Sequence, residues 1–300
     1  MTHASKLIQG LRSVALMVPD LQKAEEFFTQ TWHLQVCDRQ ESAIYLRGTG
    51  ADHHLLSLHP CEGNAKIKHV TLRARSLDAI EHVAQKTVAA GGRLVQAKHA
   101  VSEPGGGQAI VVADPAGRVF QIVHGDTVNT ASEQRDQPIR LAHVVLNSDD
   151  VENARPFFEQ AFDFSLADRT RIMAFLRCNS DHHSIALGDT DNNALNHIAF
   201  LMPKLDDVMR GGGRMKDAGF DIEWGPGRHG PGNNLFNYFI GPFDLVIEYT
   251  TEVQQIDDTY KTGMPEDWKW PAGRVDQWGI SKPPTDKLKQ AQKAILFNPV

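Results

Sequence analysis

Short runs in which apolar and polar residues alternate recur along the chain, separated by a few longer segments with helical spacing. In the first half, the runs VALMV, SAIYLRG, HHLLSLH, KHVTLRA, AIVVAD and RVFQIVH alternate as strands do, whereas KAEEFF and LDAIEHVAQKTVAAG have helical spacing. Alternation indicates strands that are buried on one face, as in antiparallel or mixed sheets. The pattern therefore predicts an α+β protein with largely antiparallel, mixed sheets and helices packed outside them.

The same order of elements occurs twice. LRSVALMVPDLQKAEEFF, residues 11–28, aligns without a gap with LAHVVLNSDDVENARPFF, residues 141–158. Three further pairs of segments continue the match: 52–58 with 181–187, 68–72 with 196–200, and 114–123 with 241–250. Two similar halves are therefore expected, joined by the polar linker 124–138.

A further segment follows the repeat from about residue 251. It contains Trp268, Trp270 and Trp278, and its run SKPPTDKLKQAQKAI predicts a loop followed by a short, solvated helix. Two GGG runs, 105–107 and 211–213, lack the context of a phosphate-binding loop. We interpret both as loop or helix-end glycines.

Composition narrows the class of protein. The net charge is -6 and the charges are interspersed, so a nucleic-acid partner is not expected. No apolar run is long enough for a membrane helix, and the start of the chain lacks a signal-peptide core. The three cysteines have no CxxC spacing and indicate a reducing compartment. We expect a soluble, cytoplasmic protein without membrane or nucleic-acid partners.

Three side chains on separate predicted strands form a candidate site in the second half, and the first half has lost two of the three. The second-half residues are His143, His197 and Glu248, and their first-half counterparts are Ser13, His69 and Gln121. An isolated strand histidine is more often a hydrogen-bonded polar residue than a ligand, but a carboxylate within FDLVIEYT is unfavourable unless it is paired or bound to metal. Two histidines and one carboxylate can hold Fe(II), and also suit Mn(II) or Zn(II).

Three more candidates surround this set. They are His183 in DHHSIAL, and His229 and Tyr238 in GRHGPGNNLFNYF. If 181–187 is a strand, the adjacent histidines His182 and His183 point to opposite faces. We expect His183 to point inward, with Ile185 and Leu187, and His182 to be solvated. Core packing or solvation remains the alternative for each of the three candidates.

These residues resemble a known family. LAHVVL, LNHIAF, GRHGPGNNLFNYF and LVIEYT together resemble the two-domain extradiol ring-cleavage dioxygenases, of catechol or dihydroxybiphenyl type, in the vicinal oxygen chelate superfamily. The resemblance covers nearly the whole chain. It implies two tandem domains, residues 1–130 without a metal site and 137–300 with one, each made of paired βαβββ modules whose mixed sheet curls into a cup with helices outside.

The resemblance also implies residue roles. The metal ligands would be His143, His197 and Glu248, and the catalytic residues His183, His229 and Tyr238. The cofactor would be Fe(II), with Mn(II) as the alternative, and the partners a catechol-type substrate and dioxygen. We also expect a homo-oligomer. His229 and Tyr238 would hydrogen-bond the substrate oxygens, and His183 would face the oxygen side and donate a proton.

Several readings stay open at the sequence level. The segment Gly230 to Asn234 departs from many biphenyl-type members, so the ring could be that of a catechol, a hydroquinone or a polycyclic diol. A glyoxalase-like metal isomerase and a metal-free aromatic- or drug-binding protein of the same fold are the two other functions. We also name Phe175, Phe236 and Phe239 as candidate pocket residues, with core packing as the alternative.

Overall fold

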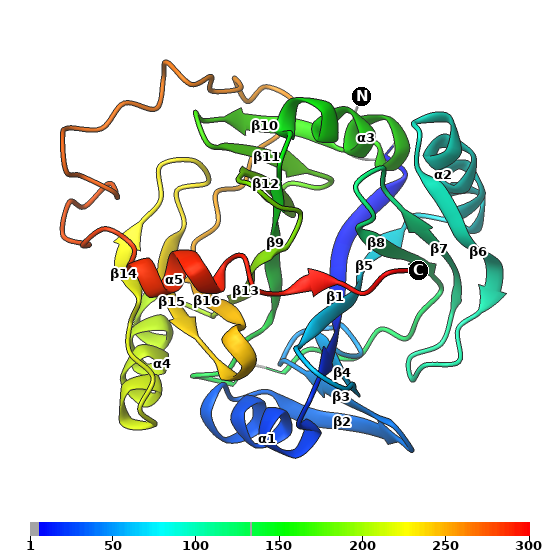
Figure 1. Cartoon of the computed structure of the whole chain (residues 1–300), viewed down its shortest axis with the longest axis horizontal. Coiled ribbons are helices and arrows are strands. Elements are labelled where there is room, and N and C mark those ends of the chain that lie inside the picture. The colour runs from blue at the N-terminus through cyan, green and yellow to red at the C-terminus, as the bar shows by residue number, and fades with distance from the viewer. Residues whose placement is uncertain (1–5, 133) are drawn as a thin grey trace.

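Two large sheets, one in each half of the chain, form the framework of the molecule (Figure 1). The computed structural model describes residues 6–132 and 134–300; the other residues, which include part of the N-terminus and Glu133 of the predicted linker, lie outside this description. Each half repeats the order β-α-β-β-β twice, as predicted. The α+β fold class is thereby confirmed, whereas the domain bounds 1–130 and 137–300 remain a prediction.

The elements of the first half are β1 (Ile8–Val18), α1 (Leu21–Glu26), the π-helical turn η2 (Phe27–Thr31), β2 (Gln35–Gln40), β3 (Ala43–Arg47), β4 (Leu56–Pro60), β5 (Lys66–Ala74), α2 (Leu77–Ala89), β6 (Arg93–Ala100), β7 (Gln108–Ala113) and β8 (Val119–His124). Those of the second half are β9 (Arg140–Ser148), α3 (Val151–Phe162), β10 (Ser165–Arg169), β11 (Met173–Arg177), β12 (Ile185–Asp189), β13 (Leu195–Leu201), α4 (Leu205–Asp217), β14 (Trp224–Arg228), β15 (Leu235–Ile240), the short helix η3 (Pro242–Asp244) and β16 (Val246–Thr251). The tail adds α5 (Asp286–Ala291) and β17 (Leu296–Phe297).

Strand order is the same in the two sheets. It is β2-β3-β4-β1-β5-β8-β7-β6 in the first and β10-β11-β12-β9-β13-β16-β15-β14 in the second. The central pairs β1–β5 and β9–β13 are antiparallel, whereas β5–β8 and β13–β16 are parallel. The edge strands β2 and β6 lie outside the runs that predicted strands, because their side chains are mostly polar and solvent-accessible.

One apolar core joins the two halves. Trp32 of the first half stacks on Tyr249 of the second, with ring centroids 3.6 Å apart, and the Tyr249 hydroxyl donates to the Trp32 carbonyl at 2.8 Å. Helices α2 and α3, one from each half, lie side by side (Figure 1). Phe120 of β8 contacts Phe158 and Phe162 of α3 edge-on. The halves are therefore fixed to each other by large buried aromatic rings.

The second glycine run does not have the predicted position. Gly211, Gly212 and Gly213 lie inside α4 rather than at a helix end. A Cβ at Gly211 would come within 2.7 Å of the Tyr249 ring, and one at Gly212 within 2.6 Å of the Asn237 amide. Close packing of the helix on the sheet explains these two glycines. The run 105–107 is a loop with positive φ at each residue, as expected.

The tail passes around the outside of the second sheet and returns to the first (Figure 1). The predicted short helix is α5, but Leu288 and Ala291 on one face of it are buried, so it is not a fully solvated helix. Strand β17 then pairs with β5 of the first sheet. All three cysteines are free. Among the described residues, no helix has the length and apolar character needed to cross a membrane.

Candidate metal centre and active site

Three adjacent strands of the second sheet carry the predicted ligands. His143 lies on β9, His197 on β13 and Glu248 on β16, and these strands are neighbours in that order. Ala199 of β13 pairs with His143 on one side and with Glu248 on the other. Because Ala199 has only a methyl side chain, the His143 imidazole and the Glu248 carboxylate can approach each other across it. His197 is two residues earlier in β13 and shares the face of Ala199.

The ligand atoms converge on one carboxylate oxygen. His143 Nε2 lies 3.1 Å and His197 Nε2 3.2 Å from Glu248 Oε2, and the three ligand atoms lie within 4.8 Å of one another. Burial raises the pKa of Glu248, but the two imidazoles outweigh it and hold the pKa below its ordinary value. The group is therefore an anion, and a buried carboxylate with two imidazole nitrogens is a suitable ligand set for a divalent ion.

Hydrogen bonds behind His197 fix the position of its proton. His197 Nδ1 donates to Asn196 Oδ1 at 2.8 Å, because an amide oxygen can only accept. Asn196 donates in turn to Asn147 Oδ1 at 2.8 Å, and Asn147 donates to the carbonyl of Gln292 at the end of α5. With the proton on Nδ1, His197 Nε2 keeps its lone pair on the Glu248 side. The residues present therefore fit a divalent ion.

Tyr238 and His229 lie beside the ligands. Tyr238 pairs with Glu248 across β15 and β16, and its hydroxyl is 3.4 Å from His197 Nε2 and 3.2 Å from His229 Nε2. Burial, followed by the charge of Glu248, raises the pKa of Tyr238 well above its ordinary value. Burial lowers the pKa of His229 to about 4. At neutral pH the site thus presents a phenol that can donate and an imidazole that can accept.

The loop between β14 and β15 is held by the tail. Gln277 of the tail donates to the His229 carbonyl at 2.5 Å and to Asn233 Oδ1 at 2.9 Å. A Cβ at Gly230 would come within 2.6 Å of Trp270, so the tail also packs directly on this loop. Asn234, at the end of the loop, donates to Thr250 Oγ1 at 2.8 Å and lies 3.5 Å from Glu248 Oε1. The departure from biphenyl-type sequences therefore lies in a loop that packs tightly around the site.

His183 points inward as predicted, and its ring centroid is 4.2 Å from that of His143. The prediction that His182 is solvated is wrong: its side chain is fully buried, and its Nε2 lies 2.7 Å from Asp168 Oδ2. Strand β12 begins only at Ile185, so the alternation of a strand does not apply to these two histidines. Both lie in an irregular segment, and their Nδ1 atoms are 3.1 Å apart.

The three phenylalanines have different surroundings. Phe236 stacks on His229 at 4.0 Å between ring centroids, and Phe175 lies 5.0 Å from His183. Both therefore lie beside histidines of the candidate site. Phe239 points to the other face of β15 and packs 6.1 Å from Trp32 in the core, so the alternative of core packing holds for it.

Residue types alone did not identify four supporting residues. They are Asn147, Asp168, Asn196 and Asn234. Asn147 and Asn196 are polar residues within predicted strands, which is a usable signal. Asp168 aligns with Asp38 in the repeat, so both halves keep it, but only the structure shows that one of the two contacts a histidine.

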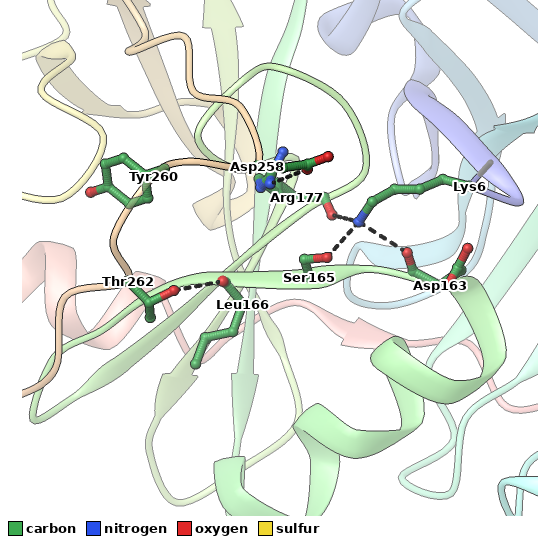
Figure 2. A pocket seen from close by; sticks show the side chains of 8 residues that line it. All are labelled: Lys6, Asp163, Ser165, Leu166, Arg177, Asp258, Tyr260 and Thr262. Atoms are coloured by element: carbon green, nitrogen blue, oxygen red, sulfur yellow. Dashed lines mark hydrogen bonds and ion pairs between the residues drawn. The ribbon is translucent and has the colours of Figure 1, made fainter. Parts of the chain in front are cut away.

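A separate cleft lies apart from the candidate metal centre. It has a volume of about 410 Å³ and lies between Lys6 and Tyr260 (Figure 2). Lys6 Nζ donates to Ser165 Oγ at 2.6 Å and to the carbonyls of Asp163 and Arg177. These internal acceptors occupy the Lys6 ammonium, so this contact attaches a residue just before β1 to the second half.

Comparisons with known proteins agree with this geometry. Metapyrocatechase 2 from Cupriavidus necator is 26% identical over 306 residues, which cover 92% of this chain and 90% of that protein. A manganese-dependent 2,3-dihydroxybiphenyl 1,2-dioxygenase from Geobacillus genomosp. 3 is 27% identical over 255 residues, or 76% of this chain and 80% of that protein.

A solved structure has closer sequence similarity. The Mn(II)-bound glyoxalase from Novosphingobium aromaticivorans is 31% identical, with a TM-score of 0.87 and coverage of 94% of each chain. Residues 10–122 and 140–249 each match one protein family, so the match includes both halves and all three candidate ligands. The family expected from the sequence is thereby confirmed, and the chain belongs to the Glyoxalase/Bleomycin resistance protein/Dioxygenase superfamily.

Proposed function

We propose that this protein cleaves the ring of a catecholic compound next to its two hydroxyl groups, using dioxygen and a divalent metal ion. His143, His197 and Glu248 would hold the ion, Fe(II) in the first instance and Mn(II) as the alternative. The observation that carries the proposal is the convergence of these three ligand atoms within 4.8 Å, with Tyr238 and His229 within hydrogen-bond reach of each other beside them.

The chain's own groups have complementary tasks around the substrate. A bound divalent ion would act as a template for the two catechol oxygens and favour loss of a hydroxyl proton. Tyr238, whose pKa is raised by burial, stays protonated and donates a hydrogen bond to a substrate oxygen. His229, whose pKa is lowered by burial, is neutral and accepts one. These two groups therefore orient the diol and manage its proton.

The aromatic neighbours of these groups make a wall for a flat ring. Phe236 supports the His229 ring by stacking, and Trp224 lies 5.2 Å from the same imidazole. Phe175 lies on the other side, against His183. A catechol ring between these residues would be shielded from water, which strengthens every hydrogen bond to its oxygens.

A glyoxalase-like metal isomerase is the second candidate. The observation in its favour is the 31% identity to a Mn(II)-bound glyoxalase, a higher value than for the two relatives named as dioxygenases. Both functions use the same metal centre, but they differ in one respect that is simple to measure. Ring cleavage consumes dioxygen, whereas isomerisation does not.

The test uses full-length protein purified without oxygen and loaded with Fe(II) or, separately, Mn(II). Metal content is measured first, and a panel of catechols, hydroquinones and polycyclic diols is then assayed for oxygen uptake and for the absorbance of the ring-opened product. We expect both signals with at least one diol. Metal-loaded protein that consumes no oxygen but isomerises a glutathione hemithioacetal would overturn the proposal. Tight binding of an aromatic ligand that survives loss of His197 and Glu248 would favour a binding protein instead.

A further inference from the structure

The loop that carries His229 depends on contacts with other parts of the chain. It runs from His229 to Asn234 between β14 and β15, and its middle, residues 230–232, is a Gly-Pro-Gly run. Such a run offers almost no side chain for packing within the loop, and glycine leaves the backbone many conformations. One backbone bond closes the loop, from the His229 N–H to the Asn234 carbonyl at 2.9 Å. Neighbouring segments must therefore fix the rest of it.

Gln277 of the tail donates three hydrogen bonds to this loop and its stem. Its backbone N–H donates to the carbonyl of Arg228, the last residue of β14, at 2.7 Å. Its side-chain amide donates to the His229 carbonyl at 2.5 Å and to Asn233 Oδ1 at 2.9 Å. Because a backbone carbonyl can only accept, the NH₂ group of Gln277 must face the loop. One tail residue therefore bonds the stem, His229 itself and the far side of the loop.

Close packing encloses the same loop on two sides. On the side of the tail, a Cβ at Gly230 would come within 2.6 Å of Trp270. On the side of the candidate site, Gly232 has a φ of +78°, and a Cβ there would come within 3.2 Å of His183. The loop is therefore packed between the tail and a buried histidine, and Gln277 supplies polar contacts on the side of the tail.

The equivalent loop of the first half, residues 101–107, is held by residues of that half. The side-chain amide of Gln40 in β2 donates to the Ser102 carbonyl at 3.0 Å, and the Thr127 N–H donates to the Gly105 carbonyl at 2.8 Å. A glutamine side chain thus bonds the loop in each half. In the second half, however, that glutamine belongs to the tail, which has no first-half equivalent.

We propose that Gln277 is a positioning residue for His229, whose backbone it holds so that the imidazole stays beside the Tyr238 hydroxyl, 3.2 Å away. It acts through the backbone of the loop and is neither a metal ligand nor a catalytic residue in this proposal. The effect on catalysis rests on the proposed function, in which His229 accepts a hydrogen bond from the substrate. The tail is thereby part of the active site, although the repeat does not contain it.

Two substitutions remove the donor and keep the length of the side chain. In Gln277→Glu, both side-chain hydrogen bonds are lost and a carboxylate oxygen faces the His229 carbonyl, because a carboxylate can only accept. Gln277→Met removes the donor without adding a charge. Gln40→Glu is the matched control, since it removes the corresponding donor from the loop of the first half.

Hydrogen exchange tests the loop without catalysis. Full-length protein loaded with Mn(II) is compared with the variants by mass spectrometry of peptides that contain residues 229–234. We expect these amides to exchange about 10-fold faster in both Gln277 variants, because hydrogen bonds that hold the loop are lost. Exchange in β16 should stay the same, and Gln40→Glu should leave residues 229–234 unchanged. Unchanged exchange of the loop in the Gln277 variants overturns the proposal. Faster exchange in β16 as well, in both variants, shows a general loss of stability and also overturns it.

Kinetics test the consequence for catalysis. With Fe(II) loaded, both Gln277 variants should keep their metal content and KM, whereas kcat falls by about 10-fold to 100-fold, as for a catalytic group that is slightly misplaced. A raised KM with unchanged kcat, or faster loop exchange with unchanged kcat, overturns the catalytic part. Gln40→Glu should change neither constant. If the unmodified protein cleaves no diol, the proposed function fails, while the exchange measurement still decides whether Gln277 holds the loop.

Discussion

The two halves differ in charge at one equivalent position beside the candidate site. In the first half, Arg12 supplies a positive charge: the guanidinium is buried, donates to Ser13 and His54, and is paired with Asp126 at 3.3 Å. Ala142 occupies the equivalent position in the second half, where its buried methyl group packs in a cluster with Ala199 and Val253. The first-half sheet therefore has a guanidinium where the second-half sheet has an apolar side chain.

The residue on the central strand, between the two outer side chains of each half, also differs. Ala199 separates His143 from Glu248, whereas Thr71 separates Ser13 from Gln121 and donates to the Gln121 amide oxygen at 3.1 Å. The first-half row is therefore closed by a hydrogen bond between neutral groups. A repeat of one fold has been specialised in one copy for packing and in the other for chemistry, by few substitutions on one face.

Loss of a ligand should give the largest contrast between the halves. His197→Ala is expected to lose its bound metal, and the ring-fission rate should fall by at least about 10³-fold, because the metal contributes several kcal/mol to the reaction. His69→Ala, its counterpart, should retain the metal. Metal analysis by mass spectrometry and the oxygen electrode measure the two effects. Metal loss in both variants would remove the distinction between the halves.

Removal of the Arg12 guanidinium should lower the free energy of unfolding and leave metal binding unchanged. Arg12→Met leaves His54 and Asp126 short of a buried partner, although Asp126 keeps Arg73 at 2.7 Å. We expect unfolding to be easier by about 2 to 4 kcal/mol, near the range for a broken buried ion pair. Urea denaturation measures this change, with metal content as the control. Unchanged stability would contradict the structural role given to Arg12.

Loss of the Tyr238 hydroxyl should lower the reaction rate and leave the metal content unchanged. Val111 of β7 occupies the position that Tyr238 has in β15, since each pairs with the third residue of its row. Tyr238→Phe keeps the ring but loses the donor, so kcat should fall by about 10²-fold at unchanged metal content. A fall in bound metal of the same size would instead assign Tyr238 to the ligand set.

Replacement of the hydrogen-bond acceptor behind His197 should have the smallest effect on metal binding. Asn196→Ala removes the acceptor for His197 Nδ1 and should weaken metal affinity by about 10-fold to 100-fold. Lys68, its counterpart next to His69, faces the surface near Glu103, and Lys68→Ala should leave the affinity unchanged. Competition with a chromophoric chelator measures both affinities. Equal effects of the two variants would argue against a specific role for the amide.

The features shared by the two halves could be predicted from the sequence, whereas those that involve contacts with the tail could not. The order of elements along the chain and the three candidate ligands could be predicted because alternation and an internal alignment act over short distances, as for His143 and Glu248. His182 was misplaced because its partner Asp168 is covered by residues 260–263, and that segment has no equivalent in the first half. The edge strands β2 and β6 were missed because solvent-facing polar residues carry no periodic apolar signal.

Strand β17 has a consequence for how the protein is made. It pairs in parallel with the start of β5, and the Asn298 N–H donates to the Ile67 carbonyl at 2.8 Å. During translation, β5 leaves the ribosome long before residues 296–298 do, so the short edge at Lys66 and Ile67 lacks its β17 partner until then. A product that stopped before Leu296 would keep that edge open to pairing with another chain. Covering this part of β5 therefore depends on residues 296–298.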